Sequence, residues 1–95
     1  MKVTFSGEVW YWRGPPPHYF VTVPAEPCQD LQRVSGLVSY GWGMIPVTVG
    51  LGSSTWTTSL FPKDGGYIVP LKAHVRAREG VDEGQTVTVE LTVDT

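Results

Sequence analysis

The sequence predicts a mainly β domain: a small closed or split barrel of about six or more strands, with two short helices. Several segments alternate apolar and polar residues, which is typical of strands with one buried face. The 95 residues include 11 glycines and 8 prolines, which indicate many turns. Hydrophobic residues make up 41% of the chain and charged residues 17%, a composition that favours one packed core.

The first half predicts three strands and one helix. Val3, Phe5, Val9 and Tyr11 share one face of a long first strand, so Trp10 and Trp12 face the other way. The elements expected after it are a proline-rich loop over 13–18, a strand over 19–23, a short helix from Pro27 to about Gly36, and a strand over 45–51.

The second half predicts a similar series. We expect a strand over 55–61, a turn over 62–66, a strand over 67–69, a short helix over 71–79 closed by Gly80, and a last strand over 87–93. Val47, Val49, Val87, Val89 and Leu91 are expected inside the barrel, because each lies on the apolar face of its strand.

The two halves echo one another. Residues 19–24 before the first helix are similar to residues 67–70 before the second, and 46–51 are similar to 86–91. We interpret the chain as one domain, 1–95, with repeat halves of about 1–52 and 53–95. An internal duplication and chance similarity of short fragments both account for the echo. If the duplication is real, neither half buries its apolar face alone, and the two interlock.

Two family resemblances follow from particular segments. Pro70-Leu71-Lys72, a basic helix and the glycine turn of residues 79–86 resemble AbrB- and MazE-type domains, which are swapped-hairpin barrels that bind DNA as dimers. Over nearly its full length the chain more closely resembles a bacterial family named domain of unknown function nineteen-oh-five. The segments that carry this resemblance are 20–24, 42–43, 45–47, 58–63, 70–72 and 75–76. It implies a single-chain, AbrB-like double-split barrel. Gln85 stands where that family usually has an acidic residue.

Charge and cysteine content narrow the function classes. The net charge of -2 does not attract nucleic acid or an anionic membrane to the molecule as a whole. A single cysteine, Cys28, allows no internal disulfide and fits a reducing compartment. The N-terminus lacks the apolar stretch of a signal peptide, so we expect a cytoplasmic protein without a membrane partner.

The sequence predicts no enzyme, metal site or cofactor. His18 and His74 are the only histidines, and no cluster has metal-ligand spacing. Cys28 and His74 are a conceivable nucleophile and base, but their places in the two halves predict that they lie far apart. Cys28 also has the helical spacing to Leu31 that is typical of a packed core thiol.

Two groups of residues are candidates for binding. Lys63, Lys72 and Arg76 form a basic group with Arg78, and Lys72 and Arg76 have the i, i+4 spacing of one helix face. Trp42 lies between two glycines and is a candidate stacking wall. We therefore expect an anionic or ring-bearing ligand near Lys63, Lys72, Arg76 and Trp42. A solvated basic face, and tryptophans packed under the proline loop or in a dimer interface, are the alternative interpretations.

These observations predict a non-catalytic binding or assembly domain for a small ligand or a protein partner. Trp10 and Trp12 make a homodimer through the first strand a further expectation, if both rings face outward. The alternative function is AbrB-like nucleic-acid binding. The net acidity weakens it, and so does the first helix, which carries Glu26 and Asp30 beside Arg33.

Overall fold

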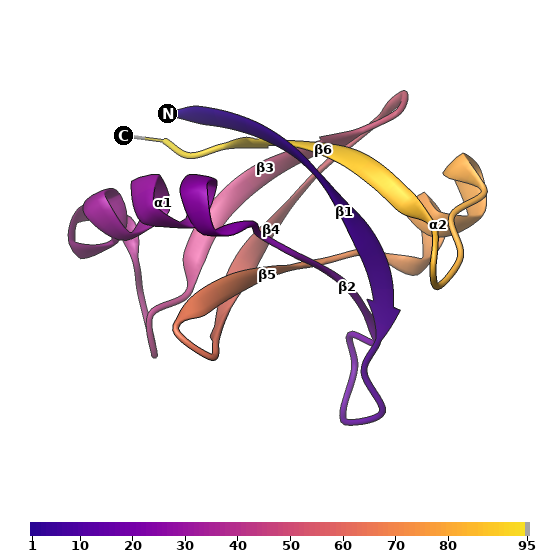
Figure 1. Ribbon diagram of the computed structural model, residues 1–95, viewed down its shortest axis with the longest axis horizontal. Helices are drawn as coiled ribbons and strands as arrows, with labels where there is room; N and C mark the ends of the chain where they lie inside the picture. The colour runs from indigo at the N-terminus through magenta and orange to yellow at the C-terminus, as the bar shows by residue number, and fades with distance from the viewer. Residues whose placement is uncertain (95) are drawn as a thin grey trace.

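The computed structural model describes residues 1–94 as a six-stranded closed barrel with two helices, which confirms the predicted fold class (Figure 1). The elements, in chain order, are β1 (Lys2–Tyr11), β2 (Tyr19–Thr22), α1 (Ala25–Val38), β3 (Ile45–Leu51), β4 (Ser54–Lys63), β5 (Gly66–Pro70), α2 (Ala73–Glu79) and β6 (Thr86–Thr92). Around the barrel the strands follow the order β1-β2-β5-β4-β3-β6.

The strand pairing joins the two halves of the chain tightly. β1 pairs with β2, and β4 pairs with β5, each within its own half. β3 pairs with β4 and β6, and β6 pairs with β1 and β3, so the last strand of each half finds its partners in the other. Every one of these pairs is antiparallel. The closed ring therefore needs both halves.

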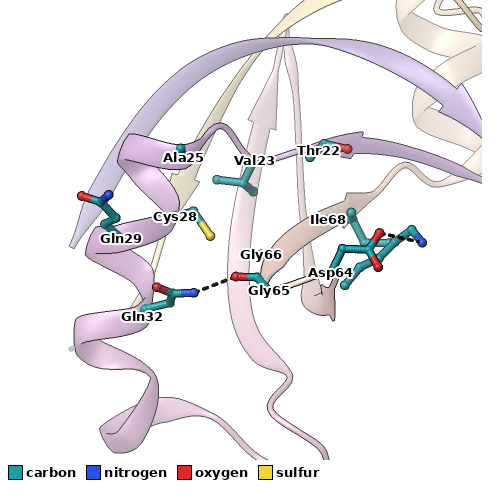
Figure 2. A pocket seen from close by; sticks show the side chains of 11 residues that line it. Thr22, Val23, Ala25, Cys28, Gln29, Gln32, Asp64, Gly65, Gly66 and Ile68 are labelled. Carbon is teal, nitrogen blue, oxygen red and sulfur yellow. Dashed lines mark hydrogen bonds and ion pairs between the residues drawn. The ribbon is translucent and has the colours of Figure 1, made fainter.

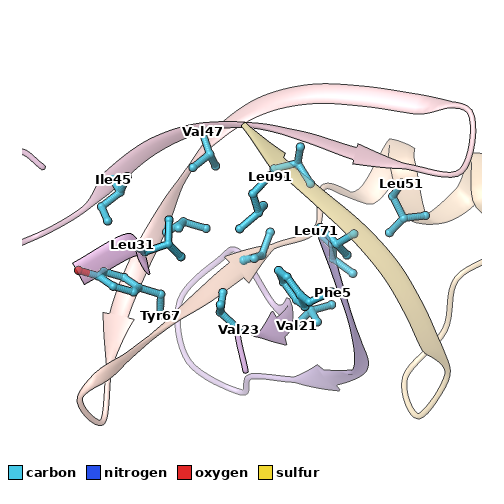
Figure 3. Packing of buried hydrophobic residues seen from close by; sticks show 14 of the residues in the cluster. Phe5, Val21, Val23, Leu31, Ile45, Val47, Leu51, Tyr67, Leu71 and Leu91 are labelled. Carbon is cyan, nitrogen blue, oxygen red and sulfur yellow. The ribbon is translucent and has the colours of Figure 1, made fainter. Parts of the chain in front are cut away.

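The inner core is built from the alternating apolar positions of the strands. Val47, Val49, Val89 and Leu91 are buried as predicted, whereas Val87 is only half-buried at the beginning of β6. Leu31 of α1 and Val75 of α2 are buried in the same core. Figure 3 shows Leu31 between side chains of β3 and β5. The helices lie at opposite sides of the barrel (Figure 1).

The β4–β5 hairpin is tighter than the sequence predicts. The expected turn over 62–66 is only two residues long, Asp64 and Gly65, with φ angles of 52° and 79°. Positive φ at both central residues gives a turn whose twist matches that of the two strands. Pro62 stays in β4, paired with Tyr67. The prediction was wrong here because a strand accepts proline wherever the missing N–H faces away from its neighbour.

The helices differ from prediction at their ends. α1 continues two residues beyond Gly36 to Val38, because a glycine inside a helix costs only about 1 kcal/mol. α2 ends as predicted at Gly80, which takes the left-handed conformation with φ 65°. Pro24 precedes α1 and Lys72 precedes α2 as the N-terminal capping residue, and neither makes a side-chain capping bond.

Candidate functional site

A second apolar layer covers the outside of the barrel over β1, β2, β5 and β4. Phe20 and Ile68 are buried but lie outside the inner core, because their strand neighbours Val21 and Val69 point inward. Trp10 stacks on Phe20 with ring centroids 5.2 Å apart, and its Nε1 donates a hydrogen bond of 3.0 Å to Thr22 Oγ1. Trp10 therefore lies on the outward face of β1, as the alternation predicts, but it packs against its own chain.

A groove opens beside this layer, and we call it the proline groove. It is lined by Trp12, prolines 15–17, Phe20, Phe61, Pro62, Lys63 and Ile68. Its volume is about 380 Å³. Proline rings are stiff and carry no N–H, so this is a largely apolar, preformed surface. Trp12 keeps 42% of its surface exposed.

Lys63 supplies the positive charge at the proline groove. Its Nζ lies 5.6 Å from the centre of the Trp12 ring, in range for a cation–π contact. The same Nζ lies 3.3 Å from Asp64 Oδ2, and the Asp64 side chain is 85% exposed. An exposed ion pair of this kind contributes little stability, about 0–1 kcal/mol. Asp64 therefore holds the charge of Lys63 only weakly.

A second groove lies between α1 and the β4–β5 hairpin, and we call it the helix groove (Figure 2). Its volume is about 430 Å³. Cys28, 7% exposed, is at its floor, and its sulfur faces the hairpin in Figure 2. Gln32 Nε2 donates a 2.8 Å hydrogen bond to the Gly65 carbonyl and so connects the two sides. Lys63 and Ile68 line both grooves, which makes the two grooves neighbours.

The structure separates Lys72 and Arg76 from Lys63. Lys63 pairs with Gly66 at the beginning of β5, while Lys72 follows its end at Pro70, the arrangement expected from the sequence. Lys72 is exposed. Arg76 is half-buried, with its guanidinium carbon 3.6 Å from the centre of the Tyr19 ring. Much of the cationic group of Arg76 therefore packs against the protein itself.

Trp42 stands on a turn next to β4 and is not part of either groove. It is 95% exposed at the tip of this turn, between α1 and β3. Tyr40 and Met44 exchange two backbone hydrogen bonds across this turn, and Tyr40 Oη lies 2.5 Å from Ser59 Oγ. Of the four residues expected to form one site, only Lys63 lines a groove with aromatic walls.

Sequence reasoning missed the partners that Lys63 acquires in the fold. The sequence predicts an outward Trp12 and a stiff loop over 13–18, but nothing in it predicts that they line one groove with Phe61 and Pro62. The alternation in β1 was the one signal available, since it predicted an exposed Trp12. Gln32 carried no signal, because its partner Gly65 is distant in sequence.

Membrane, metal and family comparisons complete the description of the site. Within residues 1–94, neither helix has the length and apolar character that a membrane crossing needs. The same residues contain no group of three or more His, Cys, Asp or Glu side chains placed to hold a metal ion.

No curated protein matches this sequence. A family model described as Domain of unknown function (DUF1905) matches residues 5–91, and the chain therefore belongs to this family.

Proposed function

We propose that this is a non-catalytic binding domain for a small molecule that carries a flat apolar ring and an anionic group. The ring occupies the proline groove, and Lys63 is the counter-charge. The observation that carries the proposal is the position of Lys63 on the Trp12 ring, at the junction of two grooves. A preformed apolar groove with one placed charge is the usual character of a small-molecule site.

The placement of the reactive side chains supports a non-catalytic role. Cys28 is in α1 and His74 in α2, and these helices lie at opposite sides of the barrel (Figure 1). A thiol and an imidazole need hydrogen-bond reach to act as nucleophile and base. The free thiol of Cys28 also supports our proposal that the protein works in the reducing cytoplasm.

The test is calorimetric titration with N-acetyl-3-(2-naphthyl)alanine, which has a flat ring and a carboxylate. Its neutral carboxamide is the matched ligand control. We expect the carboxylate to bind about tenfold more tightly than the carboxamide, as a hydrogen bond to a charged group allows. Lys63→Ala is expected to remove that difference, while Lys72→Ala, a lysine outside both grooves, keeps it. No binding of the carboxylate by the wild-type domain would contradict the proposal.

Trp42 favours a second candidate function, contact with a second copy of the chain. Tryptophan is enriched among residues that dominate protein–protein binding, and this one has 95% of its surface exposed on a turn anchored by Tyr40. Trp10, by contrast, packs on Phe20. We expect Trp42→Ala to weaken any dimer seen by sedimentation velocity, with Leu37→Ala as the exposed apolar control. A wild-type monomer at millimolar concentration contradicts this assembly role.

Nucleic-acid binding stays an alternative with less support. The guanidinium of Arg76 covers Tyr19, which leaves Lys72 and Arg78 as the remaining basic side chains of the α2 region. Phosphate contacts weaken steeply with salt. The test is the affinity for generic DNA at 50 and at 200 mM salt. A fall in affinity by orders of magnitude, roughly the loss expected for several phosphate contacts, would favour this alternative.

A further inference from the structure

We infer that the ligand is elongated: it continues from the proline groove past Lys63 into the helix groove, and its far end carries amide or hydroxyl groups. This inference rests on the proposed function, since the ring and the anion are placed as proposed above. Three features of the helix groove carry it: its continuity with the proline groove, the polar groups on its walls, and the small residues at its floor.

Continuity is the first feature. Lys63 and Ile68 line both grooves, so a molecule whose anion meets Lys63 has open space on either side of that lysine. The volumes are about 380 Å³ for the proline groove and about 430 Å³ for the helix groove. Each is within the size range of small-molecule sites, roughly 300–1,000 Å³. A ligand confined to the proline groove leaves the larger space unused.

The chemistry of the walls changes at Lys63. The proline groove has ring walls, whereas the helix groove has the side-chain amides of Gln29 and Gln32 on α1 and the backbone of Gly65 and Gly66 opposite. Gln32 uses one N–H for the Gly65 carbonyl, which leaves a second N–H and a carbonyl oxygen. Among residues 1–94, no side chain bonds to the Gln29 amide. The helix groove therefore offers donors and acceptors to a polar ligand end.

The floor of the helix groove is kept open by two small residues. A Cβ atom at Gly66 would lie 3.5 Å from Cys28 Sγ, so a side chain there would grow over the thiol. Gly66 is not among the glycines with positive φ, and its backbone conformation does not demand glycine. The missing side chain at Gly66 thus serves the depth of the groove. A ligand end that fills this depth reaches the amide of Gln32, which points across the groove to Gly65 in Figure 2.

Two probes separate this inference from the proposed function. The short probe is N-acetyl-3-(2-naphthyl)alanine, and the long probe is its N-succinamoyl analogue, which adds a terminal primary amide beyond the same ring and carboxylate. We expect the long probe to bind the wild-type domain about tenfold more tightly, since two new neutral hydrogen bonds are worth about that much. In nitrogen-15 spectra it is expected to shift the side-chain amide signal of Gln32, which the short probe leaves in place.

Two variants test the location of the polar end. Gly66→Ala is expected to reduce the advantage of the long probe while leaving the short probe's affinity unchanged, because its new Cβ lies over Cys28. Gln32→Ala provides an independent loss of the same advantage without a change in the groove floor. Asp64→Asn keeps the turn, since asparagine accepts positive φ, and is expected to tighten both probes equally by removing the competing carboxylate.

The outcomes are distinguishable. If the short probe binds with the expected dependence on Lys63 and the long probe binds no more tightly, the proposed function stands and this inference is overturned. A long-probe advantage that survives both Gly66→Ala and Gln32→Ala also overturns it. If the short probe itself does not bind the wild-type domain, the proposed function fails, and the inference fails with it.

Discussion

The two helices meet the barrel in opposite ways. α1 lies beside the β4–β5 hairpin and leaves the helix groove open, whereas α2 covers the first residue of β2 with Arg76. Cys28 and Arg76 hold the same place in their helices: each is the fourth residue, and each donates its backbone N–H to the capping residue's carbonyl, at 3.0 and 3.1 Å. At this shared position, the small side chain of Cys28 leaves the junction of α1 with the barrel open, whereas the long side chain of Arg76 closes the junction of α2 with the barrel.

This difference explains why the candidate site lies on one side of the molecule. The connection between β1 and β2 is long and rich in proline, while that between β4 and β5 is a two-residue turn. The long loop and the long helix α1 both flank the short hairpin, and Lys63 stands between them. The two grooves therefore result from the unequal halves of the chain. The short β4–β5 turn leaves space beside it, and the proline-rich loop and α1 border that space.

The largest expected effect tests how α1 is held at the open junction. Leu31 is fully buried in the core, and Leu31→Ala is expected to cost about 2–5 kcal/mol of unfolding free energy, as deletion of a buried leucine usually does. Leu37→Ala, on the same helix but 85% exposed, is the matched control. It is expected to change stability by less than about 0.5 kcal/mol. Urea unfolding measures both, and equal losses would mean that Leu31 does not hold α1 in place.

The next effect concerns the closed junction. Arg76→Ala removes the guanidinium from the Tyr19 ring, and we expect a loss of about 1–2 kcal/mol, from the cation–π contact and the packing of the arginine stem. Lys72→Ala, one helical turn earlier and exposed, is expected to leave the unfolding free energy within about 0.5 kcal/mol. If both variants are equally stable, Arg76 is a solvated surface charge, and the contrast between the two junctions disappears.

The barrel was predictable from the sequence because its signal is local. The alternation over 45–51 gave the bounds of β3, since each residue's side of the sheet depends only on its parity in the strand. The site was not predictable in the same way. Lys63 lies over the Trp12 ring and Arg76 packs on the Tyr19 ring, and both contacts join segments distant in the chain. The glycines beside Trp42 predicted a turn but not its direction.

The smallest effect is a pH dependence at the far end of α2. The hydrogen bond from Ser54 Oγ to Glu79 Oε2, at 2.5 Å, together with bonds from Ser53, holds the pKa of Glu79 below its ordinary value. These bonds connect α2 to the turn between β3 and β4. The seventh residue of α2 is Glu79, whereas the seventh residue of α1 is the buried Leu31, which has no carboxylate. The two helices therefore also differ at this position in how they respond to acid.

The direction of this effect follows from the lowered pKa. A carboxyl group whose pKa is lower in the folded state stabilises the fold at pH values above its unfolded pKa, about 4.3, and this contribution is lost as the pH falls through the folded pKa. Glu79→Gln is therefore expected to have a lower melting temperature than the wild type at pH 7, with the gap closing as the pH falls through the lowered pKa of the folded state. Glu83→Gln, at an exposed position before β6, is the control and is expected to show no such gap. A gap for Glu79→Gln that stays constant with pH would show that the ionised carboxylate is not what ties α2 to the turn.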